Sequence, residues 1–253
     1  MNKPAVTKFL PFLVAVAGCL ILSFFIQFNR VPPDDTATRY APMARAFAEG
    51  NWLYAFHPHS GVVFSTMAGS FAWLGMDGYR ACQYAALLFW GSSAVVFYFL
   101  ALRLWHKPRI ALIAEILYLL CSHLQRMVYD GLRDNGRSLG IFLVVLSLLW
   151  FYEERNQWKP AVCAAVGVAL LSMLRVDGGL FAGAGILCFI IFDISNHGWK
   201  VSRSAVLTIL FLLLIAPQLY LNYRWSGYPV LNSRYALILE KIGIPPLGRG
   251  VQL

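Results

Sequence analysis

Long apolar runs dominate the chain and predict membrane-spanning helices. They cover residues 9 to 28, 81 to 102, 110 to 125, 138 to 152, 160 to 174, 178 to 192 and 204 to 223. A helix needs about 20 apolar residues to cross the hydrocarbon core, and the shorter runs can draw on flanking residues. The first run has no small-residue cleavage site at its end, which favours an uncleaved span over a signal peptide.

The run from 60 to 76 is uncharged but rich in Gly, Ser and Ala, and it decides the topology. If it lies along the membrane surface, there are about seven spans. Five of the six lysines then share the side of the N-terminus, which the positive-inside rule makes cytoplasmic. If it crosses, there are eight spans, and Lys107, Lys159 and Lys200 move outside. We expect seven spans, with the N-terminus inside and Leu253 outside.

This pattern predicts an all-α polytopic bundle that forms a single membrane domain over residues 1–253. Its expected parts are a first span 9–28, an outer loop with membrane-parallel helices 29–80, a six-span bundle 81–223 and an outer C-terminal tail 224–253. Within the outer loop we expect a helix from Arg39 to Glu49. Tyr40, Met43, Ala44 and Phe47 fall on one face of it, as in a helix that lies on a membrane surface.

Composition and charge exclude several classes of protein. The chain is 59% hydrophobic and only 13% charged, whereas a soluble domain is about a quarter charged. The net charge of +9 comes from basic residues that stand singly between apolar runs, so anionic lipid or phosphate is the expected partner and nucleic acid is not. The five cysteines have no metal-ligand spacing and are interpreted as packing residues.

In the seven-span topology many arginines lie on the outer side, against the insertion rule, and so call for a functional reason. They are Arg30, Arg39, Arg45, Arg80, Arg126, Arg133, Arg137, Arg175, Arg224, Arg234 and Arg249. Arg133 and Arg137 stand with Asp130 and Asp134 just before a span. Guanidinium groups there can grip a phosphate bidentately, and the alternative is a charged turn with internal ion pairs.

Two acidic positions are candidates for chemistry. Asp34 and Asp35 follow Pro32-Pro33 where the first span meets the outer surface, and a carboxylate there can take a proton from an attacking hydroxyl. The alternative is a helix cap with solvated loop acids. Arg175 and Asp177 occupy a turn between two very apolar runs, and charges at membrane depth usually pair or serve a site.

Other polar residues give weaker signals. Glu115 and His123 stand eight residues apart in one run, which allows a proton relay or, as the alternative, a buried polar contact. His57 and His59 flank a proline and lack a third ligand. We therefore predict no metal and no other cofactor, with a divalent metal left as an open alternative. The chain has no P-loop, GxGxxG, GxSxG or HExxH motif.

Nearly the whole chain resembles the GT-C membrane glycosyltransferases, of the family 39 type, which include protein O-mannosyltransferases and the lipid A aminoarabinose transferase. The likeness rests on Asp34-Asp35 after the first span, the helix 39–50, His57-Pro58 followed by 60 to 76, Arg103-Leu104-Trp105, and Leu174-Arg175-Val176-Asp177-Gly178. The chain departs from the family in its short length and in the four residues between the acids and Tyr40. A short or truncated member is the expected form.

The resemblance implies an inverting glycosyltransferase of the bacterial inner membrane whose site faces outward. The donor would be a sugar on polyprenyl phosphate, and the acceptor a glycan, lipid or protein. Asp34 would be the general base beside Asp35, and Arg133, Arg137 and Arg175 would hold the donor phosphate. Candidate substrate-binding residues are Arg39, Tyr40, His57, Asp177 and Arg234. The alternatives are a membrane transporter and a non-catalytic lipid-binding scaffold.

Overall fold

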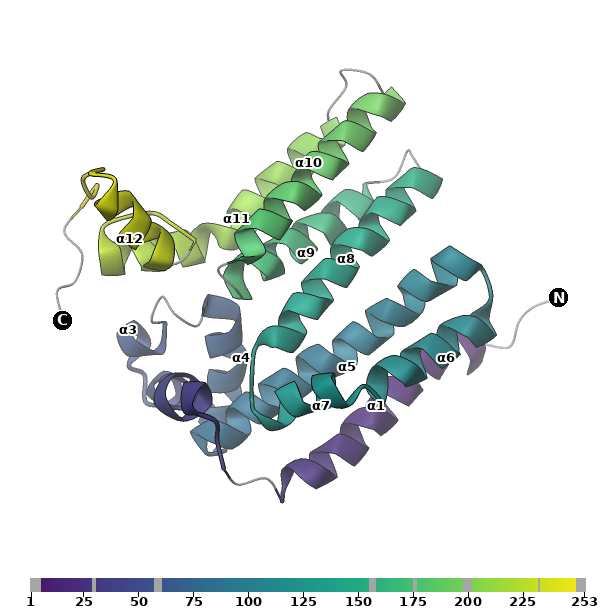
Figure 1. Ribbon diagram of the computed structural model, residues 1–253, viewed down its shortest axis with the longest axis horizontal. Coiled ribbons are helices and arrows are strands. Elements are labelled where there is room, and N and C mark those ends of the chain that lie inside the picture. The colour runs from purple at the N-terminus through teal and green to yellow at the C-terminus, as the bar shows by residue number, and fades with distance from the viewer. Residues whose placement is uncertain are drawn as a thin grey trace.

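A computed structural model describes residues 6–28, 31–56, 61–154, 158–174, 177–197, 202–231 and 233–248. Across those residues the regular structure is entirely helical (Figure 1). The helices are α1 (Val6–Ile26), the π-helix η1 (Thr36–Tyr40), α2 (Ala41–Ala48), α3 (Trp52–Ala55), α4 (Val62–Trp73), α5 (Gly78–Trp105), α6 (Pro108–Leu119), α7 (Ser122–Tyr129), α8 (Asp134–Glu153), α9 (Lys159–Leu174), α10 (Gly178–His197), α11 (Ser202–Ser226) and α12 (Ser233–Lys241).

Five of these helices, α1, α5, α8, α10 and α11, are long and apolar enough to cross a membrane. The pair α6 and α7 makes a sixth candidate, bent by 49° at its break. The chain is therefore an integral membrane protein with five to six candidate spans among its described residues. Helices α9 and α4 are also apolar but have 16 and 12 residues. At 1.5 Å per residue they reach about 24 Å and about 18 Å, short of the ~30 Å hydrocarbon core.

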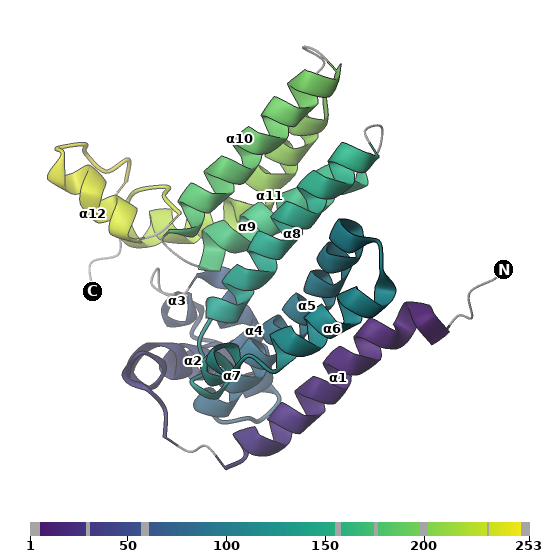
Figure 2. The ribbon, with the colours of Figure 1, turned by 45° about the vertical axis from the view of Figure 1, so that its right-hand side comes forward.

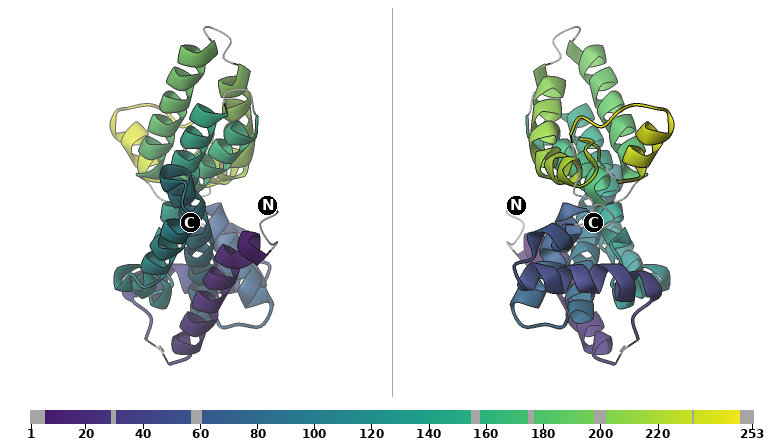
Figure 3. Two further views of the ribbon diagram at one scale, coloured as in Figure 1. Left: turned by 90° about the vertical axis from the view of Figure 1, so that its right-hand side faces the viewer. Right: turned by 90° about the vertical axis from the view of Figure 1, so that its left-hand side faces the viewer.

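The long helix α5 is the centre of the arrangement. It packs against α1, α4, α6 and α8, and Figure 2 shows α5 and α8 between α1 and α10. Figure 3 shows α9, α10 and α11 gathered on one side of the molecule and α1, α2 and α4 on the other. Helices α8 and α9 approach closely at Gly140, where an added Cβ would lie 3.0 Å from the carbonyl oxygen of Gly167. Small residues allow such close helix packing in membranes.

The bundle has two ends, which carry different segments (Figure 1). The loop end is formed by η1, α2, α3, α4, residues 130–133 and the first turn of α10. The far end is formed by the α5–α6 turn at residues 106–107 and the last turn of α8. At the loop end, Arg45 Nη2 of α2 lies 3.8 Å from Asp77 Oδ1, just before α5. The segments before and after α4 are therefore at the same level of the molecule.

The predicted outer helix is present, but its apolar face has a different partner from the one expected. The helical residues run from 34 to 48, through η1 and α2. Tyr40, Met43 and Ala44 are buried inside the protein rather than laid on a membrane surface. The Tyr40 ring packs edge-on against Phe64 of α4, with centroids 5.4 Å apart. An amphipathic pattern identifies the buried face but not what covers it.

The run from 110 to 125 is not one helix, and this corrects the pairing of Glu115 with His123. The chain breaks between α6 and α7, with Glu115 on the first and His123 on the second. Glu115 is fully buried and His123 is exposed, so they share no helix face. No hydrogen bond is made by either carboxyl oxygen of Glu115 within the described residues. The relay interpretation is wrong for this pair.

The segment interpreted as an outer tail from residue 224 contains ordered structure. Helix α11 continues to Ser226, and α12 follows from Ser233. The chain then folds back, because the Tyr228 hydroxyl donates to the carbonyl oxygen of Ile244 at 2.7 Å and the Leu247 N–H donates to that of Gly227 at 3.0 Å. These bonds hold the described part of the tail against the end of α11.

Candidate functional site

The acidic pair forms the first turn of a helix at the loop end. The Ala37 N–H donates to the Pro33 carbonyl oxygen at 2.9 Å, so helical bonding begins directly after the two prolines. Asp34 and Asp35 are both exposed. Asp35 has helical φ and ψ and makes no capping hydrogen bond, so the helix-cap interpretation is wrong for this residue. Acidic side chains in a first helical turn are nevertheless favoured by the helix dipole.

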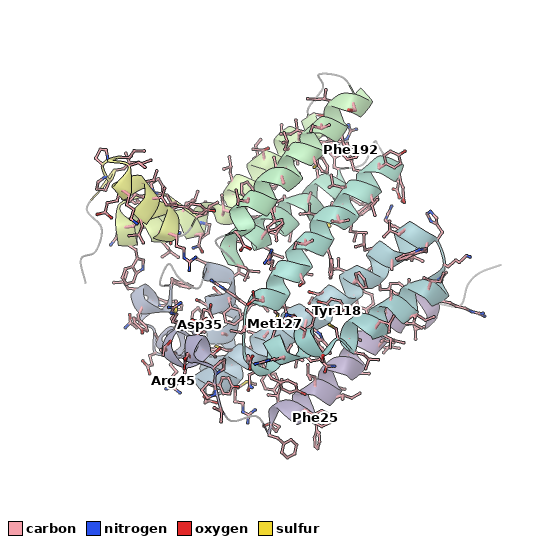
Figure 4. The ribbon with its side chains drawn as sticks, viewed as in Figure 1. Phe25, Asp35, Arg45, Tyr118, Met127 and Phe192 are labelled. Atoms are coloured by element: carbon pink, nitrogen blue, oxygen red, sulfur yellow. The ribbon has the colours of Figure 1, made fainter. Side chains whose placement is uncertain are left out.

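Asp35 has a specific partner in Arg39. The Arg39 Nη1 atom lies 3.2 Å from Asp35 Oδ1, and both side chains are more than half exposed. Asp34 differs, because its carboxylate forms no ion pair with any described residue; its backbone carbonyl accepts the Thr38 hydroxyl at 2.6 Å. Figure 4 shows Asp35 at the loop end, far from Phe192. The two acids thus have different surroundings although they are adjacent.

A π-helical turn lies directly after the acids. The Ala41 N–H donates to Thr36 O, five residues earlier, and Thr36 to Tyr40 form η1. Such turns are rare and often occur at functional sites. Thr36 is fully buried, and its hydroxyl donates to the Asp130 carbonyl oxygen at 2.6 Å. This bond fixes the acidic turn against residues 130–133.

Arg133 and Tyr40 meet across these two segments. The Arg133 guanidinium lies over the Tyr40 ring, 5.5 Å from its centroid. Burial raises the pKa of the Tyr40 phenol, and the positive charge of Arg133 opposes that shift. A cation held over an aromatic face gains electrostatic stabilisation. Asp35, Arg39, Tyr40 and Arg133, all named from the sequence, therefore occupy one region.

Arg137 and Asp177 form a second pair at the same end. The Arg137 Nη1 atom lies 3.2 Å from Asp177 Oδ2, with the side chains 29% and 39% exposed. The guanidinium also lies 4.9 Å from the Phe181 ring centroid. This contact joins α8 to the beginning of α10. Arg133 and Arg137 are four residues apart at the start of α8, so they are neighbours on one helix face.

The charged turn before α8 matches its alternative interpretation in part. Arg126 pairs with Asp130 four residues later, at 3.7 Å and with an 81% exposed side chain on the arginine. An exposed pair of this kind contributes little to stability. Arg137 instead pairs with Asp177, outside the turn. The arginines of this segment therefore have separate partners.

The remaining predicted site residues are less well placed. His57 and Arg175 lie outside the described residues. Arg234 is exposed in the first turn of α12. An added Cβ on Gly179 would lie 3.1 Å from the Tyr235 hydroxyl, so the start of α12 is beside the start of α10 and near the Arg137–Asp177 pair.

Of three residues that organise the site, Tyr79 and Gln83 were not identified from the sequence, and Arg80 was named only among the outer arginines. Tyr79 donates its hydroxyl to the Tyr129 carbonyl oxygen at 2.8 Å, and Gln83 donates its amide to the same oxygen at 2.7 Å. Arg80 donates to the carbonyl oxygens of Ile26 and Gln27 at the end of α1. The signal available was a set of large polar residues in the first turns of an otherwise apolar span, where such residues are expensive and need partners.

A metal centre has no candidate ligand set in the described part of the chain, since His, Cys, Asp and Glu do not gather there in groups of three. Comparison with protein-family models, curated proteins and solved structures finds no match for this chain. The candidate site therefore stands on its own geometry. Its elements are the acidic turn, Arg133 just before α8 and Arg137 in the first turn of α8, brought together at the loop end.

Proposed function

We propose that this chain is a membrane glycosyltransferase that moves a sugar from polyprenyl phosphate to an acceptor. One observation carries the proposal: the acidic turn at 34–35, Arg133 and the Arg137–Asp177 pair come from distant parts of the sequence and meet at the loop end. Inverting sugar transfer needs a base for the acceptor and positive charge for the departing phosphate. These residues supply both groups.

The reaction would proceed in a single displacement. The acceptor hydroxyl attacks the anomeric carbon as the bond from that carbon to the phosphate oxygen breaks, and the phosphate leaves with the electron pair. The acceptor proton passes to an aspartate. Asp34 is the assigned base, because Asp35 is held by Arg39 at 3.2 Å, whereas the Asp34 carboxylate pairs with no described residue. Arg133 and Arg137 would stabilise the charge that develops on the phosphate.

We further propose seven crossings, made by α1, α5, the α6–α7 pair, α8, α9, α10 and α11. The Arg45–Asp77 contact supports this count, because an α4 that crossed the membrane would separate these residues. The loop end, with its arginines, would face outward from the bacterial inner membrane, and the far end would face the cytoplasm. The positive-inside rule predicts few arginines on the outer side, and a role in phosphate binding would explain why so many lie there.

The test is transfer from a panel of radiolabelled polyprenyl-phosphate sugars by membranes that contain the chain. Asp34→Asn should reduce the rate by about 10²- to 10⁴-fold, because an amide cannot accept the proton. Asp77→Asn is the matched control, since Asp77 is a true cap that accepts the N–H groups of Tyr79 and Arg80. Asparagine caps about as well as aspartate, so this variant should keep its activity.

The transfer rates of the two single variants show which aspartate is the base. Asp35→Asn should have the smaller effect if Asp34 is the base, and the larger effect if the roles are exchanged. Near wild-type transfer by both single variants and by the double variant would remove the acidic pair from the mechanism. A wild-type chain that transfers none of the sugars would favour the scaffold interpretation instead. Membrane accumulation of each variant must be measured alongside.

A further inference from the structure

A large cavity lies at the far end of the bundle, away from the candidate site. It has a volume of about 1000 Å³, is open on one side, and is lined by the start of α1, the end of α5 and the start of α6. Its apolar walls are formed by Leu10, Tyr98, Phe99, Leu102, Ile110 and Leu112. The volume is at the upper end of the range for sites that bury a small organic ligand. These apolar walls can pack against a hydrocarbon chain.

The rim of this cavity is basic. His106, Lys107 and Arg109 line it, together with Pro108, and all three are exposed. They form no ion pair with any described residue. Among the described residues, no acidic side chain lines this cavity. Pro108 begins α6, a helix of 12 residues, so the positive end of its dipole adds to the same field.

Two acids line an adjoining cavity, which shares Phe99, Leu102, His106 and Pro108 with the larger one, and both acids have a partner. Glu153 and Glu154 at the end of α8 both contact Arg103, the second at 3.5 Å. The Arg103 guanidinium also lies 5.0 Å from the Trp150 ring centroid. Arg103 therefore offsets part of the charge of these acids.

The backbone at the rim is held in a costly conformation. His106 has φ 53°, and it is the one non-glycine residue of the described chain in the left-handed region. It ends α5, with its N–H donating to the Leu102 carbonyl oxygen at 2.8 Å. Glycine is the usual residue here, and such strain clusters where ligands bind. The strained turn presents three consecutive rim residues, His106 to Pro108, to the cavity.

We propose that this cavity binds one anionic phospholipid from the bilayer. Its phosphate would lie between Lys107 and Arg109, and an acyl chain would run along Phe99 and Leu102. Charge complementarity selects this occupant, because basic pockets between membrane helices bind anionic lipid head groups. A neutral lipid would fill the apolar part but gain nothing at the rim. The proposal does not depend on glycosyl transfer.

The experiment is native mass spectrometry of the detergent-purified chain, titrated with phosphatidylglycerol or phosphatidylcholine. The wild type should retain one phosphatidylglycerol in preference to phosphatidylcholine. The double variant Lys107→Gln/Arg109→Gln should bind phosphatidylglycerol about 30-fold more weakly, since each basic residue near a membrane surface raises the affinity roughly fivefold. Its affinity for phosphatidylcholine should not change.

The control variant is Lys159→Gln/Lys241→Gln, which removes the same charge from exposed positions outside the cavity. It should bind phosphatidylglycerol like the wild type. Ile110→Trp, which narrows the cavity and leaves the charges in place, should weaken both lipids. Equal affinity of the wild type for the two lipids would overturn the proposal. Equal losses in the two double variants would also overturn it, because binding would then follow net charge alone.

Discussion

Gly61, at the start of α4, packs closely against the end of α9. Its φ is +74°, and an added Cβ would overlap the carbonyl oxygen of Met173. Gly50 has φ +76° but open space around it, so it is a matched control for backbone strain alone. Gly50→Ala should cost about 1–2 kcal/mol, and Gly61→Ala a further ~1–3 kcal/mol from the overlap. Thermal unfolding in detergent measures both, and equal losses would show that α4 and α9 are not in contact there.

The sequence pattern predicted which side chains are buried better than it predicted which residues they contact. Tyr40, Met43 and Ala44 were identified as one face, and that face is buried. The interaction of Asp35 with Arg39 follows helical spacing and was predictable. Whether Asp35 caps the helix or belongs to its first turn depends on where the helix begins, which the sequence did not show. Thr36 could not have been found, because its bond to the Asp130 carbonyl joins residues 94 positions apart. No local signal in the sequence encodes such a contact.

At the scale of elements, a buried polar contact joins α10 to α11. Asp193 is fully buried and accepts the Ser204 N–H at 3.0 Å and the Ser204 hydroxyl at 2.9 Å. Arg203 Nη1 lies 3.8 Å from its other oxygen. Asp193→Ala should therefore cost about 3–5 kcal/mol, because it breaks a largely buried ion pair and removes the acceptor of both Ser204 donors. Asp177→Ala removes a half-exposed pair and should cost only about 1 kcal/mol. Comparable shifts in melting temperature would contradict this difference.

The boundaries of helices that coincide with one long apolar run were predictable from the sequence. A break between two helices inside one run was not. The run at 178 to 192 corresponds to α10, which begins at the same residue and continues to His197. The run at 204 to 223 corresponds to α11, which is a few residues longer at each end. The run at 110 to 125 is divided between α6 and α7 without a proline or glycine at the break. The available signal was the polar character of α7, which carries Gln125 and Arg126. Hydropathy alone averages over such a change.

At the scale of the whole molecule, the class of fold followed from composition, whereas the site depended on tertiary contacts. Apolar content and run length predicted a helical membrane bundle, and the long apolar helices agree with it. The meeting of Arg137 with Asp177 and of Arg133 with Tyr40 requires α8 to begin beside η1 and the start of α10. Pairings between helices depend on side-chain packing in lipid, for which hydropathy gives no register.

The path of the chain through the membrane can be tested with single cysteines in a chain whose five native cysteines are replaced by alanine. Glu49→Cys and Lys241→Cys mark the loop end, and Lys107→Cys and Glu154→Cys mark the far end; all four positions are exposed. In the seven-span topology, an impermeant maleimide should label the first two in intact cells and the second two only after permeabilisation.

Leu74→Cys decides the path of α4, because Leu74 follows this helix and is 70% exposed. A helix of 12 residues spans about 18 Å, and the Arg45–Asp77 contact places its flanking segments at one level. Residue 74 should therefore react like residue 49, in intact cells. If it reacts only after permeabilisation, like residue 107 in the seven-span topology, α4 crosses the membrane. The bundle would then have an even number of spans, and the Arg45–Asp77 contact could not exist in the bilayer.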